Sequence, residues 1–294
     1  MKYRMLRLKV VRDMYWRMRR IVVGRIMKSI NSEDFPDNKK AARMFTHVIN
    51  RIIRPIHHSF FWGDRLLSLD KSQSFLEDKR FKKTFEEIRG SHLYDQYGGE
   101  HTIAWRLNTL VWAARCGLSL DGDFVECGTF KGDMAWVIVK TLEFGDLDNR
   151  TFYLYDSFEG FSRELSSEED FPSSPGFFEF TDRAYKIPEL YENVVKRFEG
   201  IENVKITKGF LPDSLHDNSP EKIAFLHIDL NSAAPEIGVL KLLFDRVVSG
   251  GIIVFEDYGW LMHEKQRETE YIFMCERGYD VLELPTGQGL VIKR

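Results

Sequence analysis

The pattern of apolar and polar positions changes near residue 121 of the 294-residue chain. Beyond that point, short apolar runs alternate with amphipathic segments, which predicts alternating strands and helices. The strands are expected at 123–127, 151–155, 203–207, 223–229, 251–256, 279–284 and 288–293, and the helices at 132–144, 186–199, 234–247 and 262–277. This alternation predicts an α/β fold with a mostly parallel seven-stranded sheet that is covered on both faces. Only the turn residues PTGQ separate the last two strands, so that pair should be antiparallel.

Before residue 121 the pattern is helical instead. Helices are expected at 1–30, 38–54, 70–89 and 102–117, with the last one packed on the sheet, and the polar segment 31–37 (NSEDFPD) reads as a linker. We therefore divide the chain into a helical N-terminal region, 1–118, and an α/β domain, 119–294.

Charge separates the first helix from the rest of the chain. Residues 1–30 contain ten Lys and Arg against one Asp, a net charge of +9, whereas the whole chain carries −3, so residues 31–294 sum to −12. A basic amphipathic helix can lie on an anionic membrane surface, dock on a partner or on a second copy of the chain, or remain solvated. Nucleic acid is a poor candidate partner, because the body is acidic and shows no groove-reading motif.

Localisation and redox state follow from what the sequence lacks. No run of 18 apolar residues is present, and the basic N-terminus has no apolar core of a secretory signal. The three cysteines are widely spaced and predict neither a disulfide framework nor a zinc site. We expect a cytoplasmic protein, either free or peripherally attached to a membrane, and a homo-oligomer.

The segment 123–132 (DFVECGTFKG) holds the first candidate chemistry. A strand ends on Glu126, and a turn with Gly128 and Gly132 leads into a helix, which is either a cofactor cradle or an ordinary strand–helix turn. Asp156, at the end of the next strand, can accept hydrogen bonds from ribose hydroxyls or cap its own turn. The glycine spacing of a dinucleotide fold is incomplete, and an acid at the strand tip suits the sulfonium of S-adenosylmethionine (SAM) better than a pyrophosphate.

More acids follow the fourth and fifth strands. Asp229 and the pair Glu256–Asp257 should converge at one sheet edge, where they could bind Mg²⁺ or simply cap helices. His227 shares a strand face with Asp229 and is either a general base or a packed core residue. The long segment 161–186 could act as a lid over an acceptor.

Five segments together resemble the TylF / macrocin O-methyltransferase family of class I SAM-dependent methyltransferases. They are GDFVECGTFKG, YLYDSFEGF, KGFLPDSL, FLHIDLNSAAPEIGVLKLLFDRVVSGGIIVFEDYG and LPTGQGLVIK. The resemblance implies a Rossmann-like methyltransferase fold, and methyl transfer from SAM to a hydroxyl of a sugar, glycolipid or polyketide-type small molecule. It also implies a Mg²⁺ ion at the tips of the fourth and fifth strands.

The resemblance also implies roles for single residues. Glu126 and Gly128 would meet the methionine end of SAM and Asp156 its ribose, while Asp229 would be both a metal ligand and the catalytic base. Further members of the matching segments are candidates by position: Gly132, Ser157 and Asp213 for the cofactor, His227 for catalysis, and Glu256 and Asp257 for the metal.

One departure from the family pattern bears on the metal and on the base. The family commonly has DGD after the fourth strand and DD after the fifth, where this chain has DLN (229–231) and ED (256–257). Asn231 can ligate an ion but cannot serve as a base. Two other functions remain open from the sequence: an NAD-dependent oxidoreductase, against which the glycine spacing and the terminal hairpin argue, and a non-catalytic SAM-binding or assembly protein.

Overall fold

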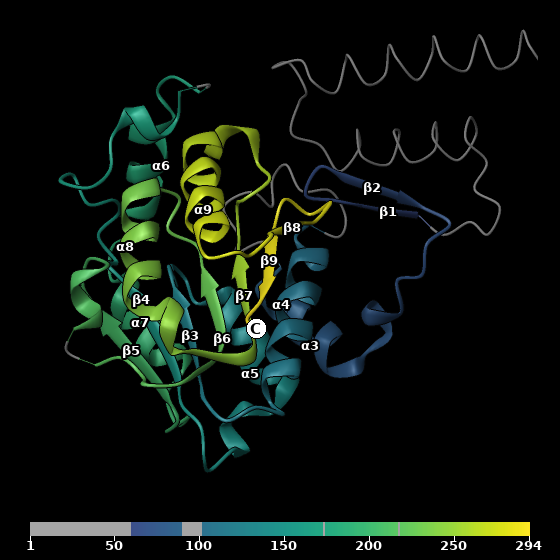
Figure 1. Ribbon diagram of the computed structural model, residues 1–294. Helices are drawn as coiled ribbons and strands as arrows, with labels where there is room; N and C mark the ends of the chain where they lie inside the picture. The colour runs from purple at the N-terminus through teal and green to yellow at the C-terminus, as the bar shows by residue number, and fades with distance from the viewer. Residues whose placement is uncertain (1–59, 90–101, 173, 217) are drawn as a thin grey trace, which may run out of the picture.

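A computed structural model describes residues 60–294, with the exception of 90–101, 173 and 217 (Figure 1). The helices expected at 1–30 and 38–54 and the linker 31–37 lie outside the described residues, so the interpretations of the basic N-terminal helix stay predictions. None of the helices in the described part of the chain has the length and apolar character that crossing a membrane requires.

The described chain is built on a seven-stranded sheet with the order β5-β4-β3-β6-β7-β9-β8. The strands are β3 (Asp123–Cys127), β4 (Phe152–Asp156), β5 (Val204–Lys208), β6 (Ile223–Ile228), β7 (Val247–Phe255), β8 (Leu282–Glu283) and β9 (Gly289–Ile292). The first five are parallel, whereas β9 runs antiparallel to both β7 and β8. The predicted fold, including its antiparallel terminal hairpin, is confirmed.

Two apolar layers cover the sheet because side chains along each strand alternate between its faces. On β3, Phe124 packs in the layer that holds α3 (Lys79–Ile88), α4 (Ala104–Gly117), α5 (Asp133–Leu142) and α7 (Leu190–Arg197). Val125, one residue later, packs in the layer that holds α8 (Ala233–Leu243) and α9 (Glu264–Glu276). Figure 1 shows α4 and α5 on one side of the strands and α8 on the other.

Helix α4 packs on the sheet, as the sequence predicts for 102–117. Leu107, Leu110 and Ala114 are fully buried in the same core as Phe124 and Phe225 of the central strands. The division of the chain at residue 118 stays a prediction.

Two elements differ from the sequence prediction. Residues 60–69 form a hairpin of β1 (Phe60–Gly63) and β2 (Leu66–Leu69), whose two turn residues, Asp64 and Arg65, have φ of 50° and 58°. The helix expected at 70–89 begins only at Lys79, where the Asp78 carboxylate caps it by accepting from the backbone N–H of Arg80 and Phe81.

The segment expected to be a lid, 161–186, contains α6 (Phe177–Tyr185).

Candidate active site

The carboxyl ends of β3, β4 and β6 meet where the strand order reverses, which is where open α/β sheets bind ligands. Three turns leave the strands there, and each contains a non-glycine residue with left-handed backbone: Phe130 (φ 48°), Phe158 (φ 55°) and Asn231 (φ 57°). Such conformations cost about 1–3 kcal/mol each and concentrate at functional sites. Their convergence at one edge marks this edge as the candidate site.

Residue 128 must be glycine because the turn after β3 crosses the turn after β6 at this position. Its φ is +97°, and a Cβ placed on it would lie 1.8 Å from the backbone oxygen of Asp229. No side chain fits there, because the turn after β3 rests directly on the turn after β6. The glycine therefore serves the chain's own packing first, and it also lines the cavity that opens beside it.

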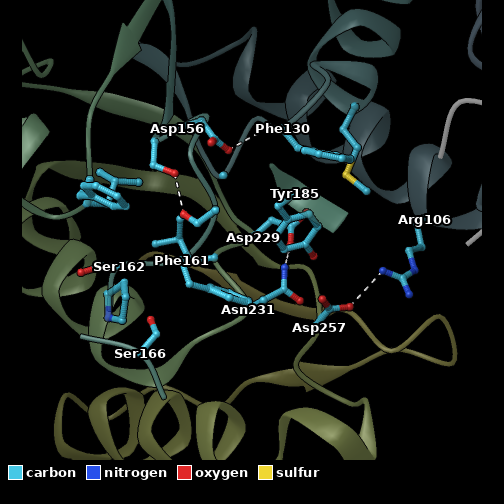
Figure 2. A pocket seen from close by; sticks show the side chains of 18 residues that line it. Arg106, Phe130, Asp156, Phe161, Ser162, Ser166, Tyr185, Asp229, Asn231 and Asp257 are labelled. Atoms are coloured by element: carbon cyan, nitrogen blue, oxygen red, sulfur yellow. Dashed lines mark hydrogen bonds and ion pairs between the residues drawn. The ribbon is translucent and has the colours of Figure 1, made fainter. Parts of the chain in front are cut away.

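A cavity opens at this edge, and its space, with the solvent in its open mouth included, is about 960 Å³. Figure 2 shows Asp156 on one wall and Asp229, Asn231 and Asp257 together on another. Phe161, Ser162, Ser166 and Tyr185 of the segment 161–186 close a further side. That segment thus lies where a lid would, and its movement stays a prediction.

Asp156 caps its own turn, which is one of the two roles that the sequence left open, and binding of ribose hydroxyls stays a prediction. One carboxylate oxygen accepts from the backbone N–H of Phe130 at 2.8 Å, and the other accepts from that of Phe158 at 2.6 Å. The carboxylate thus holds the turns after both β3 and β4 while it lines the cavity (Figure 2). Burial raises the pKa of Asp156, against the effect of these backbone donors. Since each carboxylate oxygen has two lone pairs, the group can still accept from a ligand.

Asp229 faces the cavity from the end of β6, and Asn231 orients it. The Asn231 amide donates to Asp229 Oδ1 at 3.0 Å. Burial, together with the nearby carboxylates of Asp257 and Glu256, raises the pKa of Asp229 well above its usual value. A carboxyl group of this kind is closer to the range in which a general base works at neutral pH.

His227 does not have the geometry of a general base, which corrects the catalytic role that we considered for it. It is fully buried, with Nδ1 3.0 Å from Glu126 and Nε2 3.1 Å from Glu256. Burial lowers the pKa of a histidine, but the two carboxylates outweigh burial and raise the pKa of His227 to about 10. The imidazole is therefore protonated at neutral pH and has no capacity to accept a further proton.

Glu126 is a correction of the same kind. Its side chain is 1% exposed and lies against His227, behind the cavity wall rather than in it. Burial raises its pKa despite the hydrogen bond from the histidine. We expected this carboxylate to meet the methionine end of SAM. It instead links β3 to β6 through its contact with His227.

Three other cofactor candidates differ in their placement. Ser157 lines the cavity, and its hydroxyl donates to the backbone oxygen of Gly160 at 2.7 Å. Gly132 begins α5 with φ of +73°, and a Cβ there would contact Phe198 at 2.9 Å, so its role is in packing. Asp213 is exposed at the start of a short 3-10 helix and does not line the cavity.

The acids expected to bind Mg²⁺ do not fit that ion. Glu256 Oε1 accepts from Arg106 Nη1 at 3.1 Å, and Glu256 Oε2 accepts from Gln288 Nε2 at 2.7 Å and contacts His227. Asp257 Oδ1 accepts from the same Arg106 nitrogen at 3.1 Å (Figure 2). Among the described residues, no three His, Cys, Asp or Glu side chains are arranged as a metal site. The predicted ligands are thus engaged by protein donors.

Comparison with known proteins now decides the family. The model of the macrocin O-methyltransferase (TylF) family matches residues 106–276, more than half of the chain. The chain belongs to this family. The predicted family is thereby confirmed, and we set the NAD-dependent oxidoreductase aside.

A curated member, mycinamicin III 3''-O-methyltransferase of Micromonospora griseorubida, is 25% identical over 159 residues, which are 52% of this chain and 62% of that protein. The chain thus matches less than two thirds of that relative's length.

Two solved structures share the fold. The O-methyltransferase NovP aligns with a TM-score of 0.54 and 18% identity, over 71% of this chain and 88% of its own. The calicheamicin methyltransferase CalS11 aligns with a TM-score of 0.55 and 15% identity, over 76% of this chain and 94% of its own. At these identities the likeness shows the fold alone.

Two residues of the site escaped the sequence analysis. Arg106 lies on an apolar helix and Asp64 in a hairpin that we did not predict, and neither belongs to a motif. One signal for Arg106 was available: it is one of only two basic residues in the apolar segment 102–117, and a buried arginine needs a partner. Nothing local in the sequence points to Asp64, since its contact with Arg106 spans 42 positions.

Proposed function

We propose that the protein transfers a methyl group from SAM to a hydroxyl of a small molecule of the sugar, glycolipid or polyketide class. The observation that carries the proposal is the family match over the segment that builds the cavity. Strands β4 and β6, which lie on either side of β3, present Asp156 and Asp229 to one space, one acid for each half of a two-substrate reaction. The activity for which the curated relative is named, methylation of mycinamicin III, supports a natural-product acceptor.

In the proposed complex, Asp156 accepts hydrogen bonds from the ribose hydroxyls, and the turn at Gly128 borders the cofactor. When bound, SAM supplies an electrophilic methyl group on a sulfonium. The walls of the cavity hold the acceptor oxygen in line with that methyl group, and positioning of this kind supplies about 7–11 kcal/mol of the barrier reduction.

Asp229 removes the proton of the acceptor hydroxyl. Burial and the carboxylates of Asp257 and Glu256 raise its pKa, although Arg106 in the same cavity acts to lower it. The sulfonium of the bound donor adds a positive charge, which lowers the pKa of a nearby carboxyl group and favours its base form. Asn231 keeps the carboxylate aimed at the acceptor through its hydrogen bond to Asp229 Oδ1.

The test measures S-adenosylhomocysteine (SAH) formed from SAM in the presence of nucleotide-activated sugars, glycolipids and macrolide glycosides. We expect turnover with at least one acceptor class, and a loss of about 10²–10⁴-fold in Asp229→Asn. SAH affinity should change by less than about threefold in that variant, because Asp229 acts on the acceptor. The matched control is Asp121→Asn, whose carboxylate is 83% exposed and pairs with Lys222.

Three outcomes separate the possibilities. Full turnover in Asp229→Asn would refute the assignment of the base. SAH binding without turnover on any acceptor would favour the non-catalytic SAM-binding protein. Absence of SAH binding to the wild-type protein would refute the proposed function as a whole.

A further inference from the structure

We propose that the guanidinium group of Arg106 takes the place of the divalent cation that the family resemblance implies, so that this protein organises its acceptor site without a metal ion. The inference rests on the proposed function, which identifies the cavity as an acceptor site. The position of the guanidinium in that cavity comes from the geometry alone. Arg106 then acts as a positioning residue, a fixed positive charge in the wall of the cavity.

The first observation is the position of one nitrogen atom. Arg106 Nη1 lies 3.1 Å from Glu256 Oε1 and 3.1 Å from Asp257 Oδ1, the two acids that follow β7. An ion that bridged these two oxygens would need the volume that Nη1 fills. Mg²⁺ also demands ligand oxygens at about 2.0–2.1 Å in octahedral geometry, which two carboxylates already sharing a guanidinium do not offer.

The second observation is that the guanidinium is anchored from the opposite side. Arg106 Nε donates to Asp64 Oδ2 at 2.5 Å, and the group lies over the ring of Trp260 at 4.9 Å. The arginine side chain is only 5% exposed, so a swing away from the acids would leave a buried charge unpaired. Asp64 lies before the segment 106–276 that the family model matches, so the anchor comes from a part of the chain outside that match.

The third observation concerns the carboxylates themselves. Glu256 is 1% exposed and also contacts His227 and Gln288, so it could join a metal only by giving up these partners. Burial acts to lower the pKa of Arg106, but the carboxylates of Asp64, Asp257 and Glu256 outweigh burial and raise this pKa above its usual value. The site therefore already contains a permanent cation, and a second one would be repelled.

The placement of Arg106 suits a role in the reaction. It lines the cavity together with Asp229 and Asp257 (Figure 2). A guanidinium there offsets the negative charge of Asp257 next to the acceptor site. It also provides a directional donor that can hold an oxygen of the acceptor, one of the tasks that a metal ion performs elsewhere.

The experiment titrates Mn²⁺ into the full chain in the presence of saturating SAH, with the signal of free Mn²⁺ followed by electron paramagnetic resonance. The proteins are the wild type, Arg106→Met and the control Arg80→Met, which removes an exposed arginine paired with Glu143. A double variant, Arg106→Met with Asp64→Asn, covers the case in which the single change leaves too much buried charge for folding.

We expect no Mn²⁺ bound to the wild type or to Arg80→Met at millimolar concentration. A folded Arg106 variant should bind one ion per chain, with an affinity at least about 100-fold higher, because Glu256 and Asp257 lose the guanidinium that they share. Binding of one Mn²⁺ by the wild type, abolished by Asp257→Asn, would overturn the proposal. So would a folded Arg106 variant that binds no ion.

SAH binding in the presence of EDTA is measured on the same samples by calorimetry. Failure of SAH to bind the wild type would count against the proposed function. If the wild-type protein binds both SAH and Mn²⁺, the proposed role of Arg106 is refuted, whereas the proposed function is not.

Discussion

Replacement of His227 by Gln should destabilise the protein strongly, and in a way that depends on pH. The imidazole is fully buried between Glu126 and Glu256, at 3.0 and 3.1 Å. Glutamine keeps a polar side chain in that position but carries no charge, so Glu126 loses the positive charge beside it and Glu256 retains only that of Arg106. The matched control is His216→Gln, since His216 is exposed.

The magnitude follows from the shifted pKa. A rise of the pKa of His227 from 6.5 to about 10 corresponds to about 5 kcal/mol of stabilisation. Burial raises the pKa of Glu126 and offsets part of this gain. We therefore expect the variant to lose about 3–5 kcal/mol of unfolding free energy at pH 7, the usual cost of breaking a buried charge pair.

The sign of the pH dependence is fixed by the direction of the shift. A histidine whose pKa is raised in the folded state contributes its full stabilisation below pH 6.5 and loses it as the pH rises through about 10. The difference between wild type and His227→Gln should therefore shrink between pH 7 and pH 10. Guanidinium chloride unfolding at three pH values measures it. A difference below about 1 kcal/mol at pH 7, or one that does not change with pH, would refute a protonated His227.

Two further predictions concern the packing around the site. Gly128→Ala should cost more than about 3 kcal/mol, because its Cβ would lie 1.8 Å from the Asp229 backbone oxygen. Gly176→Ala, with φ of +80° and nothing within 4 Å, should cost only about 1 kcal/mol, so equal melting temperatures of the two variants would contradict the crossing of the turns. Burial and Glu236 raise the pKa of Glu270, so the wild-type protein should lose unfolding free energy as the pH rises above 4.5, by up to about 1.4 kcal/mol per pH unit. Glu270→Gln should remove this pH dependence. Parallel curves of unfolding free energy against pH for the wild type and the variant would exclude the raised pKa.

The sheet could be predicted from the sequence because each strand lies in a local apolar run. Phe124 and Val125 alternate between two cores, and the short PTGQ turn leaves no chain for a crossover. Asp156 and Asp229 could be predicted for a related reason, since the carboxyl ends of neighbouring parallel strands meet at one edge.

The functional state of the acids could not be predicted, because it depends on distant partners. Asp229 and Glu256 both follow central strands, yet one faces the cavity and the other is enclosed by Arg106, His227 and Gln288. Gln288 lies 32 positions from Glu256, and Arg106 lies 150 positions away. Local pattern shows where a carboxylate sits along a strand, whereas the donor that neutralises it is set by tertiary packing.

The most direct measurement is the crystal structure of the full chain with saturating SAH. We predict SAH in the cavity beside Gly128, with its ribose hydroxyls on Asp156 and with Arg106 still on Asp257. A cavity without SAH at saturating concentration, or SAH bound at another surface, would contradict the proposal that this edge of the sheet is the methyl-transfer site.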